Sequence, residues 1–158
     1  IDAFGDPDAV LVIDETGDVK KGTKTVGVLC QYTGTAGRNE NSQVAVYMTY
    51  TSSAGHALID RALYLPQGWI DDRDRCTDAR VPDDVDFATK PALAATLITR
   101  ALDADVPVGW VAGDEVYGAD PKLHRVRHRR VRASNRGLEM RHNDDSRAGP
   151  GSHRLRSK

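Results

Sequence analysis

Two aspartates stand at corresponding places in the chain, each at the end of a short apolar run. Asp14 follows the run 9–13, and Asp114 follows the run 106–112 with only Gly113 between. Apolar runs of this length are typical of buried strands. Ligand sites in open α/β sheets gather where such strands end, and paired carboxylates supply hard oxygen ligands for a divalent metal ion. The pattern predicts a metal site, although an aspartate at a strand end is also a common turn residue.

The elements that must position these aspartates lie between them. Two strand-like runs, 43–51 and 57–65, flank a glycine turn and predict a hairpin. Apolar residues at helical spacing over 93–102, with Thr89 as N-cap and a proline in the first turn, predict a helix. The charged stretch 71–86 predicts a surface excursion with one short helix.

The order of these elements predicts the architecture. A second helix is expected to begin at Asp120-Pro121, after the strand that precedes Asp114. A strand, a hairpin, a crossover helix and a further strand together indicate an α/β protein with a mixed sheet. The crossover would make the last strand parallel to its neighbour, which would bring Asp14 and Asp114 together.

Composition restricts the class of protein. No window approaches the roughly 18 apolar residues of a membrane span, so we expect no membrane partner. The two cysteines, Cys30 and Cys76, fit no zinc spacing, and we expect them to be reduced thiols in a cytoplasmic protein.

Charge is distributed unevenly along the chain. From His124 onward there are 11 Lys and Arg against 3 Asp and Glu, which leaves 11 basic and 20 acidic residues before it. The segment 125–158 lacks any periodicity, so we expect an irregular basic tail without a packed core. Two origins remain open for this tail. It is either the product of a frameshift or a disordered extension that binds nucleic acid.

Several segments resemble one known family. The stretch 10–22, with the sequence VLVIDETGDVKKG, resembles the first acidic motif of insertion-sequence transposases of the DDE superfamily, and the segment 26–44 resembles the region that follows it. The stretch 110–118, WVAGDEVYG, resembles the second acidic motif, and segments 63–69 and 87–91 match the run between them. The resemblance covers about residues 5–124.

The resemblance implies a fold and an activity. The fold would be a ribonuclease-H-like mixed sheet with flanking helices over residues 1–124, incomplete at its C-terminal end. The activity would be Mg²⁺- or Mn²⁺-dependent cleavage and strand transfer of DNA at transposon ends, with Asp14 and Asp114 as the first and second catalytic and metal-binding acids. Such transposases act on transposon ends and target DNA, and oligomers are possible.

The sequence departs from the family after Asp114. The family's third acid is a glutamate on a later helix, and Glu139 lacks the surrounding motif, so we do not assign that role to it. We therefore expect this chain to be catalytically inactive and the final strand and helices of the core to be absent. Glu15 and Glu115 would point to the opposite face from their neighbouring aspartates and take no part.

Four basic residues near the first acidic motif are candidates for DNA binding. They are Lys20, Lys21, Lys24 and Arg38. Basic side chains there would contact phosphates, and the alternative is that they are ordinary solvated loop charges. Two other functions remain open. A different metal-dependent nuclease would need a complete acidic triad, and a non-catalytic nucleic-acid-binding protein would lose its salt-dependent DNA binding if residues 125–158 were deleted.

Overall fold

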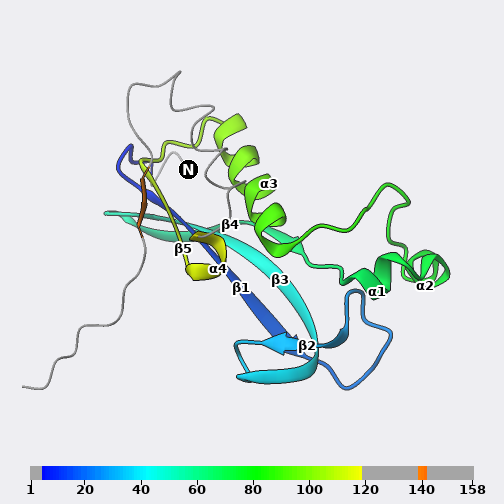
Figure 1. Cartoon of the computed structure of the whole chain (residues 1–158). Helices are drawn as coiled ribbons and strands as arrows, with labels where there is room; N and C mark the ends of the chain where they lie inside the picture. The colour runs from blue at the N-terminus through cyan, green and yellow to red at the C-terminus, as the bar shows by residue number, and fades with distance from the viewer. Residues whose placement is uncertain (1–4, 119–138, 142–158) are drawn as a thin grey trace, which may run out of the picture.

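A mixed six-stranded sheet organises the molecule (Figure 1). The computed structural model describes residues 5–118 and 139–141. The strands, in chain order, are β1 (Val10–Val19), β2 (Leu29–Thr33), β3 (Arg38–Ser52), β4 (Gly55–Leu63), β5 (Trp110–Gly113) and β6 (Glu139–Arg141). Their order in the sheet is β2-β3-β1-β5-β6, and β4 also pairs with β3. The α/β class and the ribonuclease-H-like arrangement predicted from the sequence are confirmed.

Strands β1 and β5 are parallel neighbours, as the crossover argument predicted. Their register runs from Val10 opposite Trp110 to Ile13 opposite Gly113. Gly109 and Trp110 both donate backbone hydrogen bonds to the carbonyl of Ala9, which fixes the start of this pairing. The first residue after the last pair is an aspartate on both strands.

The predicted hairpin is also confirmed. Strands β3 and β4 pair antiparallel down to Ser52 opposite Gly55, and Gly55 adopts a φ of 146° that suits glycine. The first part of β3 pairs instead with β2, which the sequence did not predict. Buried and half-buried residues alternate along β3 from Ser42 onward, because one side of the sheet packs on a helix.

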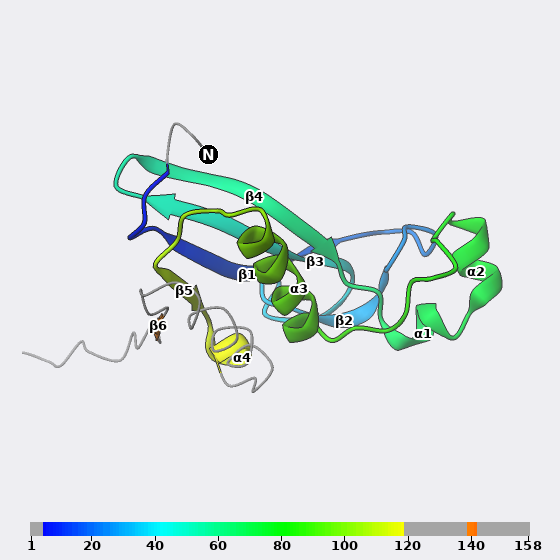
Figure 2. The ribbon, with the colours of Figure 1, turned by 90° about the horizontal axis from the view of Figure 1, so that it is seen from above.

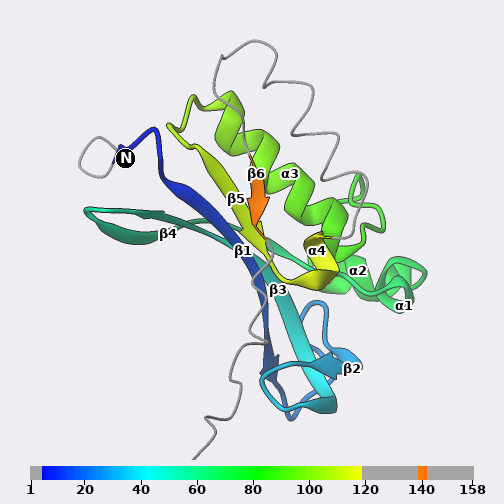
Figure 3. The same ribbon diagram turned by 60° about the vertical axis from the view of Figure 1, so that its left-hand side comes forward.

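Helix α3 (Lys90–Asp103) covers one face of the sheet (Figures 1 and 3). Thr89 is its N-cap and its side chain accepts a hydrogen bond from the Ala92 amide, as predicted. Leu97 of α3 and Leu11 of β1 are both fully buried in the same cluster. No described helix lies on the opposite face, which carries the half-buried Val12 and Tyr47.

Two short helices pack beside the β2 end of the sheet (Figure 2). They are α1 (Gln67–Ile70) and α2 (Arg73–Asp78), and α2 is the short helix predicted in the charged stretch. Trp69 of α1 is fully buried with Val28 and Cys76 in a second, smaller cluster. Cys30 and Cys76 are both free thiols, as predicted.

One sequence-based boundary was wrong. Strand β1 continues to Val19 instead of ending before Asp14, because β3 pairs with its whole length. The second helix was expected to begin at Asp120-Pro121, and these residues lie outside the described part of the chain. A four-residue helix, α4 (Glu115–Gly118), lies before them.

One short strand in the tail was not expected. We expected irregular structure after residue 124 and no final strand, yet residues 139–141 form β6, parallel to β5. The other residues of the predicted tail lie outside the described ranges. Among the residues that the structure describes, none forms a helix long and apolar enough to cross a membrane.

Candidate metal-binding acidic site

The two predicted acids come together as the topology required. Asp14 and Asp114 each follow the last paired residue of two parallel strands, Ile13 and Gly113. Neighbouring strands lie about 4.8 Å apart, so the two backbones approach within about one strand spacing. Gly113 also allows α4 to pack closely behind Asp114, because a Cβ on Gly113 would lie 3.0 Å from the Tyr117 Cβ. Both aspartates are exposed to solvent.

Each aspartate uses one carboxylate oxygen to order the local backbone. Asp14 Oδ1 accepts a hydrogen bond of 2.8 Å from the Glu15 amide. Asp114 Oδ1 accepts from the amides of Val116, at 3.0 Å, and Tyr117, at 3.3 Å, so Asp114 caps α4. The second carboxylate oxygen of each aspartate has no hydrogen-bond partner among the described residues. Those two oxygens remain available to a ligand.

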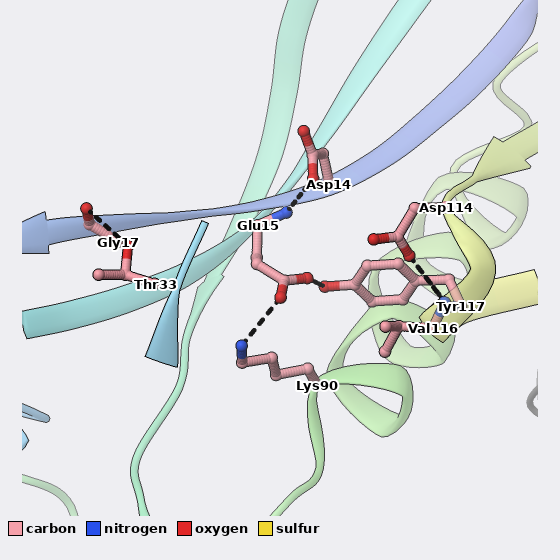
Figure 4. A network of polar contacts seen from close by, with 8 residues as sticks. All are labelled: Asp14, Glu15, Gly17, Thr33, Lys90, Asp114, Val116 and Tyr117. Atoms are coloured by element: carbon pink, nitrogen blue, oxygen red, sulfur yellow. Dashed lines mark hydrogen bonds and ion pairs between the residues drawn. The ribbon is translucent and has the colours of Figure 1, made fainter. Parts of the chain in front are cut away.

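Glu15 lies at the centre of a polar network on the other side of β1 (Figure 4). Lys90, the first residue of α3, donates to Glu15 Oε1 at 2.9 Å, and the Tyr117 hydroxyl donates to Glu15 Oε2. The side chains of Glu15 and Lys90 are only 21% and 22% exposed, so their charges are partly withdrawn from water. We call Glu15, Lys90 and Tyr117 the α4 network, because it joins β1, α3 and α4.

The sequence did not identify this network. Strand alternation predicted that Glu15 would face away from Asp14, and Figure 4 shows the two side chains on opposite sides of β1. The alternation could not show that Glu15 has partners on α3 and α4, because those partners lie 75 and 102 residues away in the chain. The side chain of Glu115 lies outside what the structure describes.

Burial and three nearby acids together raise the pKa of the Tyr117 hydroxyl. Burial raises the pKa of Tyr117 well above its ordinary value, and the hydrogen bond to Glu15 raises it further. The negative charges of Glu15, Asp114 and Asp14 add to the same shift in pKa. Tyr117 therefore stays a hydrogen-bond donor, and all three acids lie close enough to influence one phenol.

The predicted DNA-binding residues lie away from the acids. Lys20 follows the end of β1, six residues beyond Asp14, which is roughly 20 Å along a strand. Its ammonium lies 3.6 Å from Asp18, and Arg38 binds Glu40 at 2.7 Å. Lys21 and Lys24 are exposed. These four residues do not surround Asp14, because β1 is longer than the sequence indicated.

The two aspartates are of the chemical type that binds a divalent cation, but the described residues bring no third ligand to them. Asp14 and Asp114 offer hard carboxylate oxygens of the kind that Mg²⁺ or Mn²⁺ binds. Within residues 5–118 and 139–141, no group of three or more His, Cys, Asp or Glu side chains gathers closely enough to hold a metal. Glu139 does not complete the set by its backbone position. It pairs with Trp110, four residues before Asp114, or roughly 13 Å along the strand.

Comparison with known proteins agrees with the motifs. The family model described as DDE superfamily endonuclease matches residues 1–143, which extends past the boundary at residue 124. A probable transposase for insertion sequence element IS701 from Microchaete diplosiphon is 33% identical over 115 residues. That region is 72% of this chain and 27% of the relative, so the chain spans about a quarter of the relative's length. No solved structure matches. On this match, the chain belongs to the DDE superfamily endonuclease family.

Proposed function

We propose that Asp14 and Asp114 are two ligands of a divalent-metal centre, with Mg²⁺ or Mn²⁺ as the ion, that serves DNA cleavage and strand transfer at transposon ends. The observation that carries the proposal is the parallel register that ends at Ile13 and Gly113, directly before both acids. Members of the family depend on divalent metal ions. The carboxylate oxygens that lack a protein partner would hold the ion. Its contribution would be to neutralise charge at a phosphodiester group.

Metal titration of the full 158-residue chain tests the proposal. Mn²⁺ binding, followed by electron paramagnetic resonance, should weaken at least about tenfold in Asp14→Asn and in Asp114→Asn, because each variant loses a charged oxygen ligand. The matched control is Asp84→Asn, which changes an exposed aspartate outside the site. Equal affinity in all four proteins would contradict the proposal.

The DNA partner is the second part of the proposed function. Lys21 and Lys24 are exposed and have no ion-pair partner among the described residues, so their charges are available to phosphates. Lys20 and Arg38 would first have to exchange their carboxylate partners for phosphates. The proposed partners are transposon-end and target DNA.

We also propose that this chain does not cut DNA by itself. The described residues bring two acids of the site together and do not gather a third. Incubation of supercoiled plasmid with the purified chain and Mg²⁺ or Mn²⁺ should leave the plasmid intact. Nicking that requires metal and disappears in Asp14→Asn would show that the chain is active after all.

A further inference from the structure

The α4 network combines features that local sequence preferences disfavour. Glu15 lies on the same side of β1 as Leu11 and Ile13, which are 0% and 2% exposed, where a carboxylate is costly unless it is paired. Lys90 occupies the first turn of α3, where the helix dipole favours acids over bases. Each placement becomes favourable only because the other residue is present.

Tyr117 connects this pair to the aspartates. Its ring is buried, with 1% of the residue exposed, and its hydroxyl reaches Glu15 while its backbone amide donates to Asp114. Its Cβ lies against Gly113, the residue that precedes Asp114. One residue therefore contacts β1 through its hydroxyl and determines where α4 and its cap lie.

We propose that Glu15, Lys90 and Tyr117 are positioning residues that hold α4 against β1 and so fix Asp114 relative to Asp14. The inference rests on the proposed function in that Asp114 is taken as a metal ligand. Helix α4 has only four residues, so its own hydrogen bonds cannot hold it in place. The contact between Glu15 and Tyr117 supplies the constraint that the short helix lacks.

The test compares Tyr117→Phe with Tyr47→Phe in the full chain. Tyr117→Phe keeps the buried ring and removes only the hydroxyl that reaches Glu15. Tyr47 pairs with Asp14 in the β1–β3 register, and its hydroxyl has no hydrogen-bond partner among the described residues, so Tyr47→Phe is a matched control beside the site.

Two measurements separate positioning from stability alone. Without metal, hydrogen exchange at the Val116 and Tyr117 amides should become roughly fivefold faster in Tyr117→Phe, because the hydrogen bond that holds α4 to Glu15 is lost. With metal, Mn²⁺ affinity should fall about tenfold, which is the usual effect of losing a group that orients a ligand. Tyr47→Phe should change neither quantity by more than about twofold.

Lys90 offers a rescue experiment. Lys90→Met should accelerate the same amides, since Glu15 would lose its charged partner, and Lys90→Arg should keep them slow because it restores the charge. A Lys90→Arg protein as fast as Lys90→Met would contradict the proposal.

The outcomes are distinguishable. If wild-type protein binds no Mn²⁺ but Tyr117→Phe accelerates the two amides, the proposed metal site fails and the positioning network stands. If Tyr117→Phe changes neither exchange nor affinity, the positioning role is wrong. If Glu15→Gln abolishes Mn²⁺ binding while Tyr117→Phe leaves both measurements unchanged, Glu15 is itself a ligand and the positioning role is also wrong.

Discussion

Two regions join helices to the rest of the fold, one through a partly buried ion pair and the other through a buried tryptophan. The α4 network uses charged and polar groups, and its ion pair is about one-fifth exposed. Beside the β2 end of the sheet, Trp69 of α1 is fully buried. Its indole N–H donates to the Val28 carbonyl at 2.9 Å, and the Arg75 guanidinium lies 3.8 Å from the centroid of its ring. We call Trp69, Val28 and Arg75 the Trp69 anchor.

The two regions are expected to differ in whether they contribute stability or fix the position of a helix. Burial of the large Trp69 side chain removes apolar surface from water, and this is the main stabilising contribution of that region. A partly buried ion pair contributes little net stability, but it is unfavourable in any arrangement that separates its members. The Trp69 anchor is therefore expected to provide stability, and the α4 network to provide position at the acidic site.

The largest expected effect is at the Trp69 anchor. Trp69→Ala should lower the free energy of unfolding by about 4 kcal/mol, because it leaves a cavity and removes the indole hydrogen bond to the Val28 carbonyl. Equilibrium urea denaturation measures this loss. Phe87→Ala is the control, since Phe87 is 40% exposed and should lose only about 0.5 kcal/mol. Similar losses in the two variants would show that α1 is not anchored as described.

A larger residue at Gly17 of β1, which lies between the two regions, should destabilise the protein. A Cβ there would lie 2.2 Å from Thr33 Oγ1 and 2.6 Å from Thr33 Cβ, so β1 and β2 would have to separate. Gly17→Ala should destabilise the protein by about 2 kcal/mol in urea denaturation. Gly22→Ala meets no atom within 4 Å and should stay within about 0.5 kcal/mol of wild type.

A smaller effect is expected in the α4 network. Tyr117→Phe should lower the free energy of unfolding by about 1 kcal/mol at neutral pH, the value of one hydrogen bond. The loss is smaller than at Trp69 because Lys90 still pairs with Glu15. Urea denaturation of both proteins gives the value, and a loss as large as that of Trp69→Ala would overturn the comparison.

The pH dependence of Tyr117→Phe sharpens this prediction. The pKa of Tyr117 is raised in the folded protein, so its contribution to stability is complete below the unfolded pKa of 10.0 and is lost as pH rises above it. The stability difference between wild type and Tyr117→Phe should therefore shrink from about pH 9 to about pH 11. A difference that stays constant would mean that the Tyr117 pKa is not raised.

The smallest effect on stability is expected on the exposed surface. The double variant of Lys21→Ala and Lys24→Ala should change the free energy of unfolding by less than about 0.5 kcal/mol. Its affinity for DNA should fall, and the slope of log affinity against log salt should decrease by about 2 if both lysines contact phosphates. Fluorescence anisotropy with labelled DNA measures both. An unchanged slope would leave these lysines as solvated charges.

The sequence by itself determined the elements with strong local signals. Hydrophobic periodicity, the Thr89 cap and the glycine turn gave α3 and the β3–β4 hairpin, and the crossover rule gave the parallel pairing that joins Asp14 and Asp114. These features depend on residues that are close in the sequence or on the order of the elements along the chain. A single sequence shows both directly.

The tertiary structure alone decided the second half of β1, strand β2, strand β6 and the α4 network. Polar residues such as Glu15 and Thr16 interrupt the apolar pattern, so β1 could be recognised beyond Ile13 only from its pairing with β3. The partners of Glu15 come from distant segments that meet only when α3 and α4 pack on the sheet. Local preference would place neither a glutamate beside a buried isoleucine nor a lysine at the start of a helix, and packing makes the two placements favourable together.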